Sequence, residues 1–330
     1  MQTQAVVFTA PNQIAVRRVR LAEPGPSDAV VEIVYSGVSA GTERWILSDR
    51  YKGVTYPLVT GYQASGRVVA TGAAVQGVAT GQWVHVTGTR LAPDAGERAM
   101  WGGHVATAVC AAASLHPLPP GCPPAGAALA RLAAVPLHGL ELCGVTAGEL
   151  VVILGLGFVG QVAAQLAKAA GATVIGSDVI KRRVELCRRL GADEAVVASG
   201  GDDLISAVKR LKPDGADLLI DTTAHAGALN AGFEVVRRRG RVLLQAYYPG
   251  LTALDLFTPH VKELTFYNPT DSTPDGIRQS LQAMADGRLQ IEPLITCTAE
   301  AAQAPEVFAD VALRPVDNVA AVLRWREEAV

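Results

Sequence analysis

The stretch that decides the fold is LVVILGLGFVGQVAAQLAKAAG, residues 150–171. Its first five residues form an uninterrupted apolar run, which is typical of a strand buried on both faces of a parallel sheet. From Phe158 onward the apolar residues recur at helical spacing. The segment GLGFVG, Gly155–Gly160, joins the two parts, so a glycine-rich turn follows a strand directly and opens a helix.

In this context the GxGxxG pattern predicts a dinucleotide-binding loop. Gly155 allows a tight turn, Gly157 lets the backbone approach a pyrophosphate, and Gly160 lets the helix pack closely on the strand. The unpaired N–H groups at the start of the helix would bind the phosphates. We therefore predict that the cofactor contacts the loop Gly155, Leu156, Gly157, Phe158, Val159 and Gly160.

Asp178 ends the next apolar run, TVIGSD, residues 173–178. A carboxylate at this place accepts hydrogen bonds from the adenosine ribose hydroxyls and would repel a 2′-phosphate, so it favours NAD over NADP. Lys181, Arg182 and Arg183 follow, and they could either receive that phosphate or form a solvated helix face. We expect NAD as the cofactor, with NADP less favoured, and keep Arg183 as a candidate contact.

The alternation of apolar runs and helical segments continues to residue 246 and predicts a parallel sheet wrapped by helices. Polar residues directly follow the run 216–220, and the run 241–246 ends in Gln245 and Ala246. Open α/β sheets bind ligands at the carboxyl ends of their strands, so we predict cofactor contacts there for Thr222, Gln245 and Ala246. Residues 1–118 differ, because short alternating runs broken by Gly and Pro predict strands and turns.

Composition excludes several classes of protein. Of the 330 residues 49% are hydrophobic and 18% charged, with a net charge of −2, so a soluble globular protein is expected and a nucleic-acid-binding surface is not. No apolar run is long enough to span a bilayer, and the first residues lack the basic start of a signal peptide, so we expect a cytoplasmic protein. The five cysteines are scattered, which argues against a disulfide framework or a zinc knuckle.

Further segments carry a family resemblance: YPLVTGYQASGRVVATG (56–72), GQWVHV (81–86), GGHVATA (102–108) and PLHGLELCGVTAGELVVILGLGFVG (136–160). With them the chain resembles the medium-chain dehydrogenase/reductase superfamily over nearly its full length. The resemblance implies an α/β protein with a GroES-like, mostly β catalytic domain over residues 1–119 and 266–330. It also implies a Rossmann domain over 120–265 and a homodimer joined at the sheet edge around 264–268.

The resemblance also bears on metal binding. Zinc-dependent members place a cysteine where Ser39 stands, a His-Glu pair where Tyr62 and Gln63 stand, and a third ligand near Ala130 and Arg131. A serine hydroxyl and a phenol are poor zinc ligands, and an arginine would repel the ion. We therefore expect a zinc-free member with no metal site.

Two segments, SGVSAGTERWILSD (36–49) and YPLVTGYQASGRVV (56–69), are similar to dehydrogenases of this superfamily that oxidise a hydroxyethyl side chain on a chlorin ring. Gln63 and the segment DRYKGVTYP (49–57) depart from that pattern. The candidate catalytic residues are Ser39, Thr42, Glu43 and Tyr62. Ser39 and Tyr62 could donate to a substrate oxygen, Thr42 could relay a proton, and Glu43 could act as a general base or cap a helix over 43–49.

The function expected from these patterns is metal-independent, NAD-dependent oxidation of a secondary alcohol to a ketone. Aromatic residues gather in one segment and recur in others expected near the site, which favours a bulky, ring-bearing substrate: Trp45, Tyr51, Tyr56, Tyr62, Trp101, Tyr247 and Tyr248. Two other functions stay open. One is zinc-free reduction of quinones or enones by a nicotinamide cofactor, and the other is dinucleotide binding without catalysis.

Overall fold

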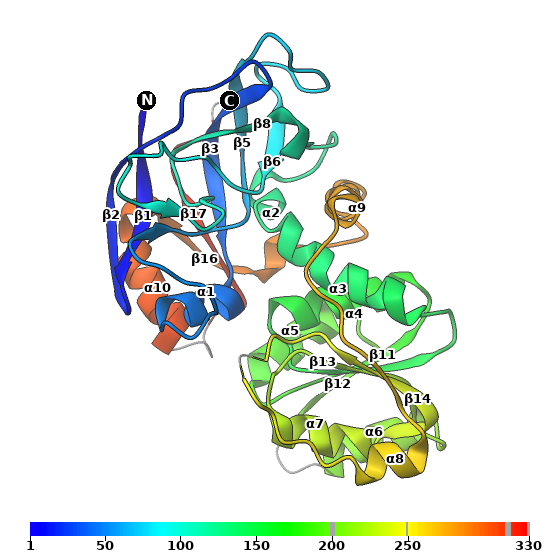
Figure 1. Ribbon diagram of the computed structural model, residues 1–330. Coiled ribbons are helices and arrows are strands. Elements are labelled where there is room, and N and C mark those ends of the chain that lie inside the picture. Colours follow the sequence, from blue (N-terminus) through cyan, green and yellow to red (C-terminus); the bar gives the residue numbers. More distant parts are fainter. Residues whose placement is uncertain (199–201, 249, 314–317, 329–330) are drawn as a thin grey trace. The chain divides into compact units, whose positions relative to one another are not determined.

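The computed structural model describes residues 1–198, 202–248, 250–313 and 318–328, and the chain divides into two compact units (Figure 1). The β unit comprises Met1–Leu132, Ile277–Gly287 and Ile291–Val330. The Rossmann unit comprises Ala133–Gly276 and Arg288–Gln290. The sequence analysis placed the domain boundaries at 119/120 and 265/266. That these are the ends of independently folding domains stays a prediction.

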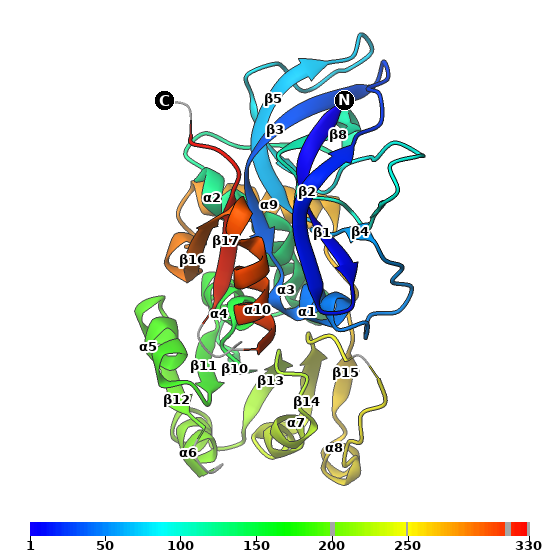
Figure 2. The same cartoon turned by 90° about the vertical axis from the view of Figure 1, so that its left-hand side faces the viewer.

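The Rossmann unit is built on a parallel sheet with the strand order β12-β11-β10-β13-β14-β15 (Figure 2). Its strands are β10 (Leu150–Leu154), β11 (Thr173–Asp178), β12 (Glu194–Val197), β13 (Ala216–Asp221), β14 (Val236–Leu244) and β15 (Thr265–Tyr267). The strand order reverses between β10 and β13, and open sheets of this kind bind ligands outside the carboxyl ends of the strands at such a point. The α/β fold class is confirmed.

Strand β10 shows why its sequence is apolar at every position. Val151 and Ile153 pack into one core, whereas Val152 and Leu154 pack into the core on the opposite face of the sheet. Helices cover both faces: α3 (Ala130–Cys143), α4 (Phe158–Ala169) and α5 (Lys181–Arg189) lie on one, and α6 (Asp202–Leu211) and α7 (Ala226–Phe233) on the other (Figure 1). A strand between two helical layers has no side chain facing water, so no polar residue alternates in it.

The β unit contains two sheets. One has the strand order β16-β17-β3-β5-β6-β9, with β8 paired to β3, and the other has the order β2-β1-β4-β7. Their strands are β1 (Gln2–Ala10), β2 (Gln13–Arg20), β3 (Asp28–Val38), β4 (Leu58–Val59), β5 (Ala64–Thr71), β6 (Trp83–Val86), β7 (Arg98–Ala99), β8 (Thr107–Ala111), β9 (His116–Pro117), β16 (Ile295–Glu300) and β17 (Ala320–Arg324). Mostly antiparallel pairing and short strands make this the GroES-like part that the sequence predicts.

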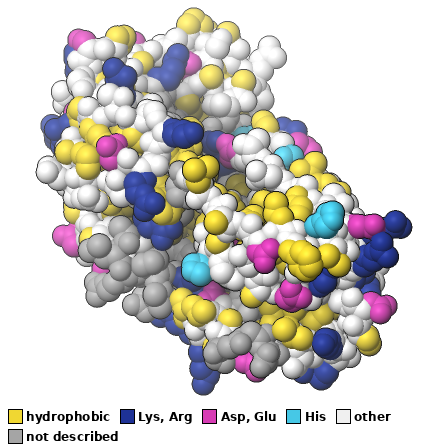
Figure 3. All heavy atoms as spheres, turned by 60° about the horizontal axis from the view of Figure 1, so that its bottom comes forward, with side chains coloured by type: hydrophobic (Ala, Val, Ile, Leu, Met, Phe, Trp, Pro, Cys, Tyr) yellow, Lys and Arg dark blue, Asp and Glu magenta, His cyan; other side chains and the backbone are white. Residues whose placement is uncertain are grey.

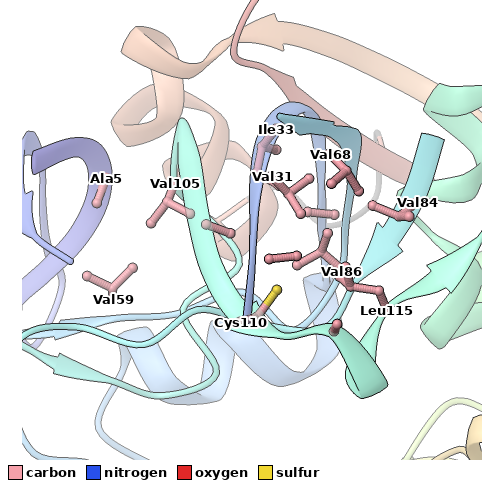
Figure 4. Packing of buried hydrophobic residues seen from close by; sticks show 14 of the residues in the cluster. Ala5, Val31, Ile33, Val59, Val68, Val84, Val86, Val105, Cys110 and Leu115 are labelled. Atoms are coloured by element: carbon pink, nitrogen blue, oxygen red, sulfur yellow. The ribbon is translucent and has the colours of Figure 1, made fainter. Parts of the chain in front are cut away.

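One apolar core fills the interior of the β unit (Figure 4). Its members come from strands far apart in the sequence, including Ala5 of β1, Ile33 of β3, Val84 of β6 and Val105. Each of these four side chains is fully buried. The alternating pattern of the short strands therefore has the expected physical basis, since one face of each strand points into this core.

A second core of the β unit lies under α1 (Ala40–Leu47) and α10 (Ala304–Leu313), and it includes Ile46 and Phe308. The Phe8 ring packs edge-on against Phe308, with 5.1 Å between ring centroids. Helix α1 begins at Ala40, three residues before the start that the sequence indicated. The sequence analysis also missed α10, β16 and β17. The runs of β16 and β17 are short, and apolar residues occur nearly all along α10, so no clear period stands out.

The surface bears on the expected partners. Figure 3 shows Lys and Arg side chains interspersed with Asp and Glu on the face that it draws. In the described part of the chain, no helix combines the length and the apolar character that crossing a bilayer requires. Strand β15 ends the Rossmann sheet, with Phe266 37% exposed and, on α8 (Phe257–Lys262), Phe257 73% exposed. Pairing of two copies at this edge stays a prediction.

His85 is a buried titratable group in the interior of the β unit. It lies opposite His116 in the β6–β9 pair, and its Nδ1 donates to the carbonyl oxygen of Ala127 at 2.7 Å. Its Nε2 has no hydrogen-bond partner among the described residues. Burial, followed by the charge of a protonated His116, lowers the pKa of His85 to about 3. The folded protein therefore holds His85 neutral.

We expect this histidine to make the protein sensitive to acid. Unfolded His85 takes up a proton near its ordinary pKa of 6.5, whereas folded His85 does so only near pH 3. The free energy of unfolding should therefore fall as the pH is lowered from 6.5 towards 3, by up to about 1.4 kcal/mol per pH unit. Urea unfolding at pH 7, 6, 5 and 4 measures this. His85→Leu should flatten the dependence, and the exposed control His260→Leu should not; equal slopes for all three proteins would contradict it.

Candidate active site

Ser39 stands at the junction between β3 and α1, as the residue that caps the start of the helix. It is 2% exposed, and its backbone N–H donates to Glu43 Oε2 at 2.8 Å. The strand leading to it passes directly against another segment, because a Cβ on Gly37 would lie 2.4 Å from the Ala128 carbonyl oxygen. The junction therefore holds Ser39 in one place.

Tyr62 brings a second hydroxyl to Ser39. It follows Gly61, which has a φ of 90° and packs so closely on His104 that a Cβ would lie 2.6 Å from its ring. The Tyr62 hydroxyl donates to Ser39 Oγ at 2.6 Å, and the Thr42 side chain also hydrogen-bonds the phenol. Three predicted residues thus meet in what we call the hydroxyl cluster: Ser39, Thr42 and Tyr62.

Burial governs the ionisation of the cluster. It raises the pKa of Tyr62 to about 12, helped by the charge of Glu43 and opposed by hydrogen bonds to Ser39 and Thr42 and by the charge of Arg131. The phenol therefore keeps its proton at neutral pH and can donate a hydrogen bond. A neutral donor of this kind can stabilise developing negative charge on an oxygen.

Glu43 lies beneath the hydroxyl cluster with no exposed surface. Its carboxylate oxygens accept from Ser39 N–H and from His104 Nε2, the latter at 3.0 and 3.2 Å. His104 Nδ1 lies 2.8 Å from Ser36 Oγ, and Trp325 Nε1 donates to the same oxygen at 2.8 Å. This arrangement fits a residue that positions Ser39 better than a general base in contact with substrate.

Two residues hold the His104 ring through its two nitrogens. Trp325 can only donate, so Ser36 Oγ accepts from it, and the same oxygen lies within hydrogen-bond distance of His104 Nδ1. On the other side of the ring, His104 Nε2 lies within hydrogen-bond distance of Glu43. We call these residues the buried chain: Ser36, Glu43, His104 and Trp325.

Aromatic rings and an arginine adjoin the hydroxyl cluster. Trp101 packs edge-on against Tyr62 with 5.4 Å between centroids, and Tyr51 packs against Trp101 at 6.3 Å. The Arg131 Cζ lies 5.0 Å from the Tyr62 ring centroid and 6.0 Å from that of Trp101. Tyr51, Tyr62 and Trp101 form what we call the aromatic wall. Tyr51 and Trp101 are half-buried, whereas Tyr62 is buried, so the exposed aromatic area beside the hydroxyl cluster comes from the first two rings.

The other aromatic candidates have different surroundings. Trp45 lies between two guanidinium groups, with Arg44 at 4.6 Å and Arg50 at 4.3 Å from its rings. The Tyr56 hydroxyl donates to the backbone carbonyl of Ile46. In the Rossmann unit Tyr247 is 43% exposed, and the Tyr248 hydroxyl donates to Asp221. The structure therefore joins only Tyr51, Tyr62 and Trp101 into one surface.

The glycine-rich loop of the Rossmann unit has the geometry that its sequence indicated. Gly155 has a φ of 85°, in the left-handed region that favours glycine. A Cβ on Gly160 would lie 1.9 Å from the Gly155 carbonyl oxygen, whereas one on Gly157 would meet no atom within 4 Å. Helix α4 begins at Phe158 without a side-chain cap, so its first N–H groups have no capping partner among the described residues.

Asp178 lies at the carboxyl end of β11 and supports this loop directly. Its oxygens accept from Leu156 N–H at 2.6 Å and from Ile180 N–H at 2.8 Å. Arg183 Nη1 lies 3.8 Å from the same carboxylate. A carboxylate has about four acceptor positions, so these contacts leave it able to accept from ribose hydroxyls. The neighbouring guanidinium is the group that would receive a 2′-phosphate.

The remaining cofactor candidates lie at the ends of β13 and β14. Thr222 Oγ1 hydrogen-bonds to the carbonyl oxygens of Leu154 and Gly155 at 3.0 and 2.9 Å, so this hydroxyl supports the loop. The backbone N–H groups of Gln245 and Ala246 donate to the Asp221 carbonyl oxygen at 2.9 and 3.0 Å. Gln245 Oε1 is buried without a hydrogen-bond partner among the described residues.

Comparison with known proteins decides the family. The model of the alcohol dehydrogenase GroES-like domain matches residues 25–120, and that of zinc-binding dehydrogenases matches 159–286. The chain is 30% identical over 331 residues to 2-desacetyl-2-hydroxyethyl bacteriochlorophyllide A dehydrogenase from Rhodobacter capsulatus, covering 99% of both chains. The chain belongs to the medium-chain dehydrogenase/reductase superfamily. It is an oxidoreductase of the zinc-type alcohol dehydrogenase-like kind.

Further relatives agree with this assignment. The enzyme of the same name from Cereibacter sphaeroides is 29% identical and covers 100% of each chain. A dehydrogenase from Sinorhizobium meliloti 1021, described as zinc-binding and solved with NADP, is 25% identical and superposes with a TM-score of 0.86 over 98% of this chain and 100% of its own. The superfamily that the sequence resembled is thus confirmed.

Zinc fits the β unit poorly. The three positions that correspond to zinc ligands hold a hydroxyl, a phenol and the Ala130–Arg131 pair, and the first two are already hydrogen-bonded to each other. Zinc in proteins takes thiolate, imidazole or carboxylate ligands. Within residues 1–198, 202–248, 250–313 and 318–328, no three His, Cys, Asp or Glu side chains gather in a way that could hold a metal ion.

A dinucleotide fits the Rossmann unit. The open space at Gly157 and the uncapped start of α4 suit a pyrophosphate, since backbone N–H groups at a helix N-terminus bind phosphates. Asp178 suits the adenosine ribose. The superfamily is dinucleotide-dependent, and the Sinorhizobium meliloti relative was solved with NADP.

Sequence reasoning missed part of the β-unit site. Ser36 and Trp325 are joined across 289 residues of sequence, and no local pattern signals such a contact. No sequence pattern singled out His104, and Arg131 was considered only as a residue that excludes zinc. A signal for Arg131 exists, because it stands in the first turn of α3, where a cation is unfavourable.

We expect Ser36→Ala to test the buried chain by stability. The substitution leaves Trp325 N–H without its acceptor and His104 Nδ1 without its hydrogen-bond partner, so the free energy of unfolding should fall by about 1–3 kcal/mol for each group. Denaturant unfolding measures the change. Ser114→Ala is the control, because that hydroxyl donates to the Ala111 carbonyl in an exposed hydrogen bond. Equal stability of the two variants would contradict the hydrogen-bond assignment.

Proposed function

We propose that the chain is a metal-independent, NAD-dependent dehydrogenase that oxidises a bulky, ring-conjugated secondary alcohol to a ketone. The observation that carries this proposal is the hydroxyl cluster of Ser39, Thr42 and Tyr62, whose side chains are hydrogen-bonded to one another. The family resemblance places zinc ligands of metal-dependent members at two of these positions, Ser39 and Tyr62. The dinucleotide loop supplies the second requirement of a dehydrogenase.

The hydroxyl cluster supplies hydrogen bonds to the substrate oxygen. The Tyr62 phenol keeps its proton because its pKa is about 12, so it acts as a donor over the whole physiological range. Ser39 accepts from Tyr62, and its own proton is then free to reach a second oxygen. Thr42 completes a path for the alcohol proton. Glu43 accepts a hydrogen bond from the Ser39 backbone and is itself held by His104, so these two residues position Ser39 and do not contact the substrate.

A bound nicotinamide dinucleotide would accept the carbinol hydride with both electrons of its C–H bond, while the hydroxyl proton leaves through the protein. Loss of hydride places positive charge on the carbinol carbon. A conjugated ring attached to that carbon shares the charge, so such an alcohol needs less help than ethanol. The half-buried rings of Tyr51 and Trp101 in the aromatic wall offer aromatic contact area to a ring of this kind.

Relatives give independent support for a ring-bearing substrate. The two bacteriochlorophyllide A dehydrogenases act, by their names, on a hydroxyethyl group of a large conjugated ring. At 30% identity the same substrate does not follow for this chain. A secondary alcohol beside a conjugated ring is the class that the chemistry of the site and these names have in common.

The proposed preference for NAD rests on Asp178. Its carboxylate lies where the adenosine ribose is expected and would repel a 2′-phosphate. Arg183 next to it favours the opposite preference, and the Sinorhizobium meliloti relative was solved with NADP. We give more weight to the carboxylate, because its position is fixed by two backbone hydrogen bonds.

The reaction itself is tested by turnover. With NAD+, we expect oxidation of 1-phenylethanol and 1-(2-naphthyl)ethanol and negligible oxidation of ethanol or sorbitol, in protein with no stoichiometric zinc by elemental analysis and with activity unchanged by chelators. Tyr62→Phe and Thr42→Val should each lower kcat by about 10²-fold or more. Faster turnover of ethanol, reduction of enones or quinones alone, or one zinc per chain would each overturn the proposal.

Cofactor preference is tested separately by binding. Titration calorimetry should give tighter binding of NADH than of NADPH, and Asp178→Ala should remove much of that difference by removing the repulsion. Arg183→Ala is the matched variant on the same site, and it should weaken NADPH more than NADH. If the wild-type protein binds NADPH more tightly, Asp178 does not determine the preference.

A further inference from the structure

Arg131 is placed in the β unit at some energetic cost. It stands in the first turn of α3, a helix with no acidic residue in that turn. The positive end of the helix dipole lies there, so a cation is unfavourable at this position. Helix stability therefore does not explain an arginine at this place.

Its neighbours fix the guanidinium beside the hydroxyl cluster. The group lies over the Tyr62 ring at 5.0 Å and near the Trp101 ring at 6.0 Å. Trp101 has a φ of 66°, in the left-handed region that is unfavourable for residues other than glycine, so the surrounding structure must hold this segment in place. Stacking on aromatic faces orients the plane of a guanidinium and directs its N–H groups outward along that plane.

The charge also acts on the reacting groups. Arg131 lowers the pKa of Tyr62 against the larger effect of burial, so its field reaches the phenol oxygen. That oxygen hydrogen-bonds Ser39, the residue at the first zinc-ligand position. Arg131 itself is one of the two residues at the third.

We infer that the Arg131 guanidinium binds the reacting oxygen of the substrate and supplies there the positive charge that zinc supplies in metal-dependent relatives. The inference rests on the proposed alcohol oxidation. In that reaction the carbinol C–H bond breaks and its electron pair leaves as hydride to the nicotinamide of NAD+. The O–H bond breaks, its electrons form the carbonyl π bond, and the proton is relayed through the hydroxyl cluster to solvent water. The oxygen gains negative character as its proton leaves.

A guanidinium suits this task for two reasons. It stays charged at physiological pH, so it stabilises an anionic oxygen without taking part in the proton transfer. Hydrogen bonds from a charged donor are about twice as strong as those between neutral groups. In this interpretation, the residue that stands in place of the third zinc ligand takes over part of the role of the metal. The hydroxyl cluster then directs the proton while the arginine carries the charge.

The kinetic test compares variants of Arg131 in the full-length protein, with 1-(2-naphthyl)ethanol and NAD+. Arg131→Met should lower kcat by about 10²-fold or more with a smaller change in KM, and Arg131→Lys should retain more of kcat. Added methylguanidine should restore part of the lost rate to Arg131→Met, which a purely structural role would not allow. Arg67→Met is the matched control, since Arg67 stacks on Trp83 at 4.9 Å and should leave kcat unchanged.

A binding test decides the inference without turnover. 2-Naphthoate carries an anionic oxygen on the ring, and 2-naphthamide is its neutral counterpart. By calorimetry, with NADH present, Arg131→Met should weaken 2-naphthoate about 10-fold or more and leave 2-naphthamide unchanged. Equal loss of both ligands, or no loss of 2-naphthoate, overturns the inference. Naphthoate binding that depends on Arg131 in a protein with no alcohol turnover would overturn the proposed reaction instead.

Discussion

The arrangement of the candidate site in the β unit depends on the hydrogen bonds of the Glu43 carboxylate. It is fully buried and accepts hydrogen bonds from Ser39 N–H and His104 Nε2. A buried charge is tolerated only where hydrogen bonds replace its hydration, so α1, the segment before β8 and the end of β3 must meet around it. The same requirement places Ser39 against Tyr62. Structure and candidate chemistry therefore share one set of contacts.

The Rossmann unit could be predicted from sequence because its signals are local. The apolar run of β10, the turn at Gly155 and the start of α4 are consecutive, and each is recognisable within a few residues. Their geometry follows from close contacts inside the same segment, such as Gly160 on Gly155. Asp178 was also predictable in place, although its hydrogen bond to Leu156 N–H was not.

The β unit was harder to predict because its contacts join distant residues. The strand pair β3–β17 and the hydrogen bond between Ser36 and Trp325 connect opposite parts of the chain. The position of Tyr62 opposite Ser39 came from the family pattern, not from any periodicity. Arg131 was misjudged because charge was considered only for its effect on a metal. The contact of its guanidinium with the Tyr62 ring can be recognised only in the three-dimensional structure.

The bond between Ser36 and Trp325 also constrains the order in which the chain can reach its final state during synthesis. Strand β17 pairs with β3, and Trp325 follows it, yet the whole Rossmann unit is translated between them. The sheet core of the Rossmann unit can form as a nearly continuous segment. The β unit must wait with Ser36 and His104 incompletely paired until residue 325 has left the ribosome. The support of the hydroxyl cluster is therefore completed only after the Rossmann unit has been synthesised.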